Sequence, residues 1–446
     1  MRRWVSAFAL LFACALGFAP GAARAVVIAQ SVAIRSQSVA RQVVAPWQPL
    51  SLSVTADGIG TLSYQWRHNN RPIAGAVNAT YSLSNVRYAD AGAYTVDVAD
   101  SRGTVTSAPM FVLVAPSRTE LVAWGRSDAI PGDQTDLVAV SAGDNYVVAV
   151  RADGSVASWG RTETVPSGLK DAVAVAAGSD FSLALKSDGT VVAWGNPSSP
   201  CLNLPANLSG VVAITAGTEI AGAVQSDGFA VVWGANGLMQ TWLPDASHHA
   251  QAVGVGSLAP LILTTEGSVV SLQGDLPAQL AYLAGIHDAV ALSSAGYHAL
   301  VLKSDGTLAD VGNYYVIAAG LTYTPINVPI GLSSVVGVAA GEVHSLALMS
   351  DGSVRAWGQA GIWAGDSYGQ ATVPASLTQA IAVSAAGYTS LALRDGSGDN
   401  VPTVATQPAD LSVGRGEWAT FSVAATGGNA PVSYQWRHNG INIVGR

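Results

Sequence analysis

The stretch that decides the fold is SVVGVAAGEVHSLALMSDGSVRAWG, residues 334–358. It consists of a β-branched run, a small-residue triplet, a second apolar strand, Asp-Gly, and a strand that ends in Trp-Gly. Close copies are DLVAVSAGDNYVVAVRADGSVASWG at 136–160 and DAVAVAAGSDFSLALKSDGTVVAWG at 171–195. Looser copies begin at residues 210, 250 and 288, and the closing glycines recur every 35 to 46 residues. Several short strands repeated at this period are typical of β-propeller blades.

Each part of the repeat has a physical role. Asp-Gly between two alternating apolar runs predicts a hairpin, because both residues accept the positive φ of a tight turn. The small triplets suit strands that crowd around a central axis. We expect four tryptophans to bury their rings between adjacent blades. They are Trp159, Trp194, Trp233 and Trp357.

The last copy of the repeat is incomplete. TQAIAVSAAGYTSLALRDG, at 378–396, stops after Asp-Gly and reaches no Trp-Gly strand. The missing strand, ELVAWG at 120–125, precedes the first full repeat and has no hairpin partner there. We therefore predict that residues 121–124 pair with the blade formed by 380–394. Residues 120–396 then close into a seven-bladed β-propeller without exposed edges.

These motifs resemble the regulator of chromosome condensation repeat family. The family signature A-A-G-x-x-H-S-L-A-L-x-x-D-G-x-V-x-x-W-G matches residues 339–358 almost letter for letter, and the spacer GQATVPASL at 369–377 matches the family's linker. The resemblance implies a seven-bladed propeller. The founding member's nuclear exchange-factor role does not carry over, because the chain is acidic and begins with a signal peptide. Secreted bacterial relatives, including a propeller-type β-lactamase inhibitor, look closer in kind.

Both flanks of the repeats predict β-sandwiches. In residues 26–115 the run 50–56 alternates apolar and polar residues, which gives one buried face. This segment resembles an immunoglobulin-like domain, with Trp66 as its core tryptophan, Tyr94 as its tyrosine corner, and Val54 and Val96 at the cysteine positions. Residues 401–446 are expected to be an incomplete second copy, because 434–439 repeat 64–69 as YQWRHN. Both sandwiches are expected to serve as spacers.

The N-terminus predicts export. Arg2 and Arg3, the apolar run 5–18 and the small-x-small site 23–25 together form a signal peptide over residues 1–25. A lipoprotein signal at Cys14 is an open alternative. We expect a secreted protein, located outside the cell, on its surface or in the periplasm, and no later segment is long and apolar enough to cross a bilayer.

The charge of the exported chain excludes some partners. Cleavage removes three of the 21 basic residues and leaves 18 against 29 acidic ones, a formal charge of −11. That sign disfavours nucleic acid and anionic lipid. Only Cys201 then remains, so no internal disulfide is expected.

No catalytic, cofactor or metal constellation is expected. His298 and His344 share a repeat position that holds Tyr, Phe and Ile elsewhere, which favours packing or backbone hydrogen bonding over metal ligation. His248-His249 has no companion at ligand spacing. We expect a binding or adhesion protein whose partner is an extracellular protein or glycan. The alternatives are an inhibitor of a secreted or periplasmic enzyme and a carbohydrate-active enzyme, whose carboxylates need no local motif.

The candidate binding residues are aromatic and lie in three long spacers between repeats. Exposed Trp and Tyr dominate binding hot spots and stack on sugars. The alternative is that these rings only cap the blades. The candidates are Trp242, Tyr314, Tyr315, Tyr323, Trp363 and Tyr368.

Overall fold

The computed structural model describes residues 32–126, 134, 136–160, 164–234, 240–242, 249–256, 260–272, 285–296, 298–316, 322–325, 328–358 and 368–396, and short pieces between 403 and 442. For 240–242, 311–316 and 322–325 it describes the backbone alone. In these residues the fold is all-β, with two 3-10 turns, Tyr88–Asp90 and Pro200–Leu202, as the only helices. No helix among them is long and apolar enough to span a membrane. The predicted signal peptide, 1–25, lies outside the described residues.

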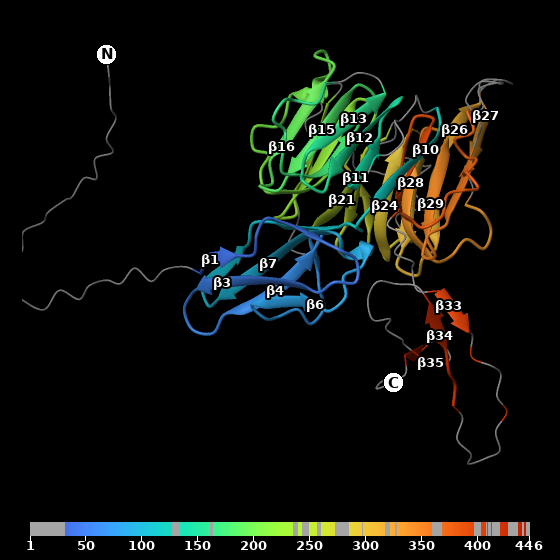
Figure 1. Ribbon diagram of the computed structural model, residues 1–446. Helices are drawn as coiled ribbons and strands as arrows, with labels where there is room; N and C mark the ends of the chain where they lie inside the picture. The colour runs from blue at the N-terminus through green and yellow to red at the C-terminus, as the bar shows by residue number, and fades with distance from the viewer. Residues whose placement is uncertain are drawn as a thin grey trace, which may run out of the picture.

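Each copy of the repeat forms a small antiparallel sheet of its own, and we call residues 119–396 the repeat region (Figure 1). The first strand of each sheet pairs with the second and the second with the third. In chain order the sheets are β11 (Leu137–Ala142), β12 (Tyr146–Arg151), β13 (Val156–Gly160); β14 (Ala172–Ala177), β15 (Phe181–Lys186), β16 (Val191–Gly195); β17 (Val211–Ala216), β18 (Ile220–Gln225), β19 (Ala230–Gly234), β20 (Gln240–Trp242); β21 (Ala250–Gly254), β22 (Leu261–Thr264), β23 (Val269–Ser271); β24 (Ala289–Ala295), β25 (His298–Lys303), β26 (Leu308–Val316), β27 (Thr322–Pro325); β28 (Val335–Ala340), β29 (His344–Met349), β30 (Val354–Gly358); and β31 (Ala380–Ala386), β32 (Thr389–Asp395), β10 (Thr119–Gly125).

The last sheet joins the two ends of the repeat region. Strand β10 pairs antiparallel with β32, from Thr119 opposite Asp395 to Gly125 opposite Thr389. The pairing predicted for residues 121–124 is therefore confirmed. An N-terminal strand completes the sheet that the last, incomplete repeat begins.

Backbone hydrogen bonds link consecutive sheets. In six junctions the N–H that begins one sheet donates to the carbonyl of the turn glycine of the sheet before it, as Ala172 N does to Gly154 O at 3.0 Å and Ala380 N to Gly352 O at 2.9 Å. The junction between the last and first sheets differs. There the Leu137 N–H donates to the Thr119 hydroxyl at 2.7 Å. Because Thr119 lies on the closing strand β10, its side chain replaces a turn that the last repeat lacks.

The Asp-Gly hairpins are confirmed, but the turn differs from the expected one. Only the glycine has positive φ, for example +85° at Gly154 and +78° at Gly189. The aspartate instead caps the turn through its carboxylate, which accepts the Ser155 N–H at 2.8 Å from Asp153. The expectation that both residues adopt positive φ was wrong, because the aspartate contributes a side-chain hydrogen bond.

The tryptophans pack between adjacent sheets, as predicted. Trp194 of the second sheet packs with Tyr146 and Val148 of the first. Trp159 of the first sheet packs with Leu393 of the last, so the same contact crosses the closure.

Residues 32–115, which we call the N-terminal module, form two sheets around one core. The sheets are β1 (Ala33–Gln37), β3 (Leu50–Asp57), β6 (Thr80–Leu83); and β2 (Arg41–Val44), β9 (Met110–Val114), β7 (Gly92–Asp100), β4 (Ser63–His68), β5 (Arg71–Pro72), with β8 (Gly103–Thr106) also on β7. Trp66 and Val96 are fully buried in this core, and the predicted alternation over 50–55 is confirmed. The Tyr94 hydroxyl donates to the Asp90 carbonyl at 2.9 Å, the bond expected of a tyrosine corner.

Beyond residue 402 the described pieces are short. Strand β33 (Thr403–Thr406) pairs with β34 (Ala424–Thr426), and β35 (Arg437–His438) pairs with β36 (Ile441–Asn442). Most of the predicted incomplete sandwich at 401–446 lies outside the described residues, so it stays a prediction.

Candidate functional site: the channel face

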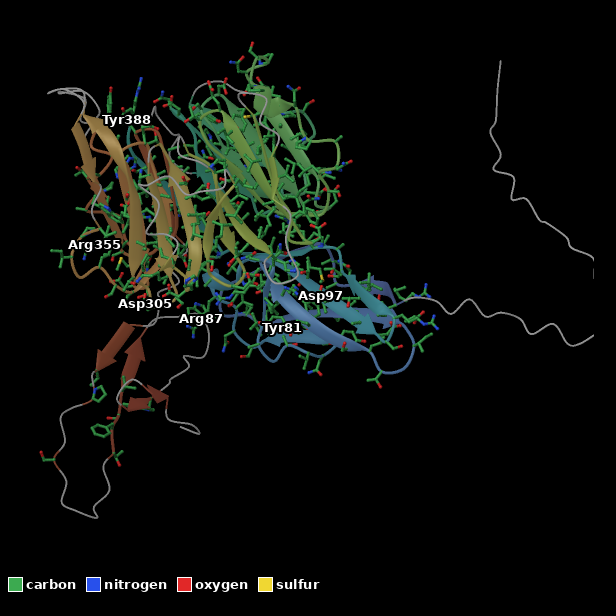
Figure 2. The ribbon with its side chains drawn as sticks, turned by 180° about the vertical axis from the view of Figure 1, so that it is seen from behind. Tyr81, Arg87, Asp97, Asp305, Arg355 and Tyr388 are labelled. Atoms are coloured by element: carbon green, nitrogen blue, oxygen red, sulfur yellow. The ribbon has the colours of Figure 1, made fainter. Side chains whose placement is uncertain are left out.

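The strand order gives the repeat region two distinct ends. The first strand of each sheet runs away from the Asp-Gly turns, so the turn between the first and second strands lies at the opposite end. We call the end with the Asp-Gly turns the turn face and the other end the channel face. Figure 2 shows Asp305 of a turn near the N-terminal module and Tyr388 at the far end.

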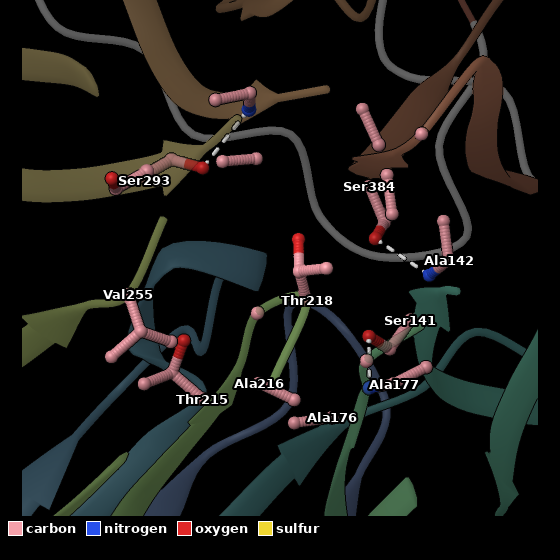
Figure 3. Close-up of a pocket in the computed structure, with 18 of the residues that line it drawn as sticks. Ser141, Ala142, Ala176, Ala177, Thr215, Ala216, Thr218, Val255, Ser293 and Ser384 are labelled. Carbon is pink, nitrogen blue, oxygen red and sulfur yellow. Dashed lines mark hydrogen bonds between the residues drawn. The ribbon is translucent and has the colours of Figure 1, made fainter. Parts of the chain in front are cut away.

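A central cavity of about 560 Å³ opens at the channel face (Figure 3). Its lining comes from the second half of every first strand and from the turn that follows, so all seven sheets contribute. Small side chains dominate, among them Ala142, Ala177, Ala216, Ala340 and Ala385. This confirms that the small triplets face the axis, where larger side chains would fill the cavity.

Serine hydroxyls on the cavity wall join neighbouring sheets. Ser141 Oγ accepts the Ala177 N–H at 3.0 Å, and Ser384 Oγ accepts the Ala142 N–H at 2.9 Å across the closure. Ser293 Oγ accepts the Ala340 N–H in the same way, at 3.0 Å. These bonds join the neighbouring first strands that form the wall of the cavity.

Carboxylates gather at the channel face. In four sheets an acidic residue stands one or two residues after the glycine of the first turn. These residues are Asp144, Asp180, Glu219 and Glu342. Asp144 and Glu342 line the cavity, where burial and the neighbouring Asp144 carboxylate raise the pKa of Glu342. The channel face therefore favours positively charged groups.

Aromatic rings stand beside the cavity mouth. Tyr388 lines the cavity, and its ring centroid lies 5.4 Å from that of Tyr368. The Arg126 guanidinium carbon lies 5.4 Å from the Tyr368 centroid, and the Tyr368 side chain is 40% exposed. A partner at this face would meet a flat, accessible phenol with one side held by a cation.

The structure places the predicted binding residues unequally. Tyr368 lies at the channel face as just described. Trp242 ends β20 opposite Ala230, and Tyr315 of β26 lies opposite Tyr323 of β27 in the backbone register. Tyr314 precedes Tyr315 in β26, and Trp363 lies outside the described residues. The assignment of these six residues as a binding site stays a prediction.

The two repeat-position histidines join sheets. His298 and His344 are 1% and 0% exposed, and their Nε2 atoms lie 3.1 Å from Ser345 Oγ and 2.8 Å from Ser390 Oγ of the next sheet. Burial lowers the pKa of His298 to about 4 and that of His344 to about 3. Within the described part of the chain no three His, Cys, Asp or Glu side chains gather as metal ligands would. The bonds to serine are therefore the role that the geometry gives these histidines.

Comparison with protein families matches residues 172–199 and 335–370 to the regulator of chromosome condensation (RCC1) repeat. These two segments carry RCC1 repeats. Together with the small all-β sheets, the matches support a β-propeller of the RCC1-repeat type. No curated protein matches the chain. An RCC1-repeat propeller suggests a protein-binding platform.

Some solved structures resemble the chain. The ectodomain of the Physcomitrella patens receptor kinase CR4 is 19% identical, with a TM-score of 0.42 over 56% of this chain and 67% of that one. The CRINKLY WD40 ectodomain of the Arabidopsis thaliana receptor kinase ACR4 is 16% identical, with a TM-score of 0.42 over 56% of this chain and 88% of that one.

The binding residues predicted from the sequence lie in the spacers and do not include the first turns. Asp144 and Glu342 follow the small triplet of their repeats directly, and Tyr388 occupies the matching turn of the last one. The signal was present, because four copies have an acid one or two residues after the glycine of this turn. Only the folded arrangement shows that these turns meet around one channel.

Proposed function

We propose that this protein is exported and binds an extracellular partner, a protein or a glycan, through the channel face. In this proposal the seven sheets are the blades of one closed propeller, and the N-terminal module is an immunoglobulin-like sandwich. The role is binding or adhesion and not catalysis. The signal-peptide pattern of residues 1–25 supports export.

One observation carries the choice of face. All seven sheets meet around a single open cavity, and the same face holds carboxylates and an exposed tyrosine. On the opposite face one turn carboxylate is paired, since Lys186 Nζ lies 2.9 Å from Asp188 Oδ2 of the same turn. An acidic, aromatic-rimmed surface fits a protein partner with basic residues better than it fits a neutral sugar.

Binding measurements on substituted full-length protein test the proposal. Extracellular proteins and a glycan panel are screened with the intact chain, and the affinity of any ligand found is compared across variants. Tyr368→Ala, Tyr315→Ala and Trp363→Ala should each weaken binding by about 1–3 kcal/mol with little change in stability. Glu342→Gln should slow association and reduce its dependence on salt.

The control lies on the N-terminal module. Arg35→Ala removes the exposed ion pair with Asp57. Because both residues belong to the N-terminal module and not to the channel face, this variant should leave affinity unchanged. Equal loss in Arg35→Ala, or full affinity in all four substituted proteins, would reject the channel face. Turnover of a polysaccharide by the intact chain would reject the non-catalytic role.

A further inference from the structure

The N-terminal module docks on the turn face of the repeat region. Arg41 Nη2 donates to the Ala152 carbonyl at 2.6 Å, beside the first Asp-Gly turn. Asn70 Nδ2 donates to the Gln225 carbonyl at 2.8 Å and to the Ala250 carbonyl at 3.1 Å. These side chains bond backbone carbonyls that three different sheets present at their ends.

The contact also pairs charges and hydroxyls. Burial lowers the pKa of Arg41, and the Asp153 and Asp171 carboxylates of the repeat region oppose that shift. The Tyr88 hydroxyl donates to Asp395 Oδ2 of the last sheet at 2.8 Å. The module thus bonds the first sheet, the last sheet and the junction between the third and fourth.

Strand β9 shows that the docked face is apolar. All five of its residues are buried. Met110, Val112 and Val114 point into the module's own core, whereas Phe111 and Leu113 belong to the cluster that contains Val173 and Val212 of the repeat region. A sheet with one face in water would alternate apolar and polar residues, so a strand buried on both sides requires a second layer. The repeat region is that layer.

The second copy of the module's sequence lacks the docking residues. The motif YQWRHN is followed by Asn70 in the first copy and by Gly440 in the second. Arg41 aligns with Asp410 or with Leu411, depending on where a one-residue gap is placed, and neither of these is basic. The polar contacts of Arg41 and Asn70 are therefore specific to the first copy.

We propose that the N-terminal module is a built-in partner of the propeller, which occupies the turn face, closes that end of the channel and unfolds together with the repeat region. On this proposal the module does more than the spacer expected from the sequence, because Phe111 and Leu113 pack against the repeat region. A ligand of the propeller can then bind only at the channel face, because the module covers the turn face.

Calorimetric unfolding of the full chain tests this proposal. The native chain should show one transition that includes module and repeat region. Phe111→Ser with Leu113→Ser makes the docked face polar and leaves Val112 in the module core. It should split the transition in two and increase the radius of gyration in X-ray scattering. Val43→Ser is the matched control, because Val43 lies opposite Leu113 in β2 but is 40% exposed.

A second variant guards against simple misfolding of the double serine variant. Asn70→Gly removes only the amide, because Asn70 has φ +63°, which glycine adopts without strain. Combined with Arg41→Leu it should lower the temperature of the single transition by several degrees relative to Val43→Ser. Two independent transitions in the native chain would overturn the proposal. So would variants of either kind that behave as the control does.

Discussion

At the residue scale, a hydroxyl that has already donated its proton fixes the state of a buried histidine. Ser390 Oγ donates to the Gln370 carbonyl at 2.8 Å, so it can only accept from His344 Nε2. His344 is then neutral, with its proton on Nε2. Protonation of Nδ1 would place a charge in a fully buried site, where Nδ1 has no hydrogen-bond partner. This explains why the pKa of His344 falls to about 3.

The depressed pKa predicts acid sensitivity. Below pH 6.5 His344 is mostly protonated in the unfolded chain. In the folded protein it stays neutral until the pH approaches 3. The contribution of His344 to stability is therefore fully present only well above pH 6.5 and is lost as the pH falls toward 3. Between pH 7 and pH 5 this group should cost about 2 kcal/mol of unfolding free energy. The second sheet has Phe181 at the repeat position of His344. A His344→Phe variant should therefore lose less stability than the native protein between pH 7 and pH 5.

Denaturant titrations of both proteins at pH 7 and pH 5 measure the difference. Phenylalanine also removes the bond to Ser390, so only the change between the two pH values is compared. If the native protein and the variant lose equal stability on acidification, His344 is not the sensitive group.

At the element scale, the turn glycines serve two functions that can be separated. Gly189 has φ +78°, and a Cβ there would stand 3.1 Å from Gly210 Cα and 3.2 Å from Val211 N of the next sheet. Gly168 has φ +81° and nothing within 4 Å of its Cβ position. Gly189 is thus needed both for the left-handed backbone of its turn and for the close packing of two sheets. Gly168 is needed for its turn alone.

Alanine at these two positions should give different costs. Gly168→Ala should lower the free energy of unfolding by about 1 kcal/mol, the strain of a left-handed backbone alone. Gly189→Ala adds a contact with the backbone of the neighbouring sheet and should cost clearly more. Thermal unfolding of both variants gives the comparison, and equal losses would show that the sheets adjust freely at this junction.

At the scale of the whole molecule, the closure is a special junction. At six junctions the backbone N–H that begins one sheet donates to a glycine carbonyl of the sheet before it. At the junction between the last and first sheets the Leu137 N–H donates to the Thr119 hydroxyl instead. Thr119 and Leu137 are both fully buried, so water cannot replace the bond. The closure also brings together residues far apart in the chain, because Trp124 Nε1 donates to the Gln370 carbonyl at 2.8 Å.

Thr119→Val keeps the shape of the side chain and removes the acceptor. The unpaired Leu137 N–H should then cost about 1–3 kcal/mol of stability, and the whole repeat region should unfold at lower denaturant concentration. Thr104→Val, at an exposed position of β8, is the control and should change stability little. A Thr119→Val protein as stable as the control would show that the closure depends on strand pairing alone.

The sequence by itself determined the repeat, the hairpins and the pairing of β10 with the last sheet. These follow from simple rules: Asp-Gly marks a turn, alternation marks a half-buried strand, and a spare strand at one end with a missing strand at the other implies closure. Only the tertiary structure decided which turns meet at the channel face and that the N-terminal module docks on the other. The run MFVLV at 110–114 signalled burial on both faces, but it did not name the second layer. That layer is formed by carbonyls and apolar side chains from several sheets, which come together only when the circle of sheets has closed.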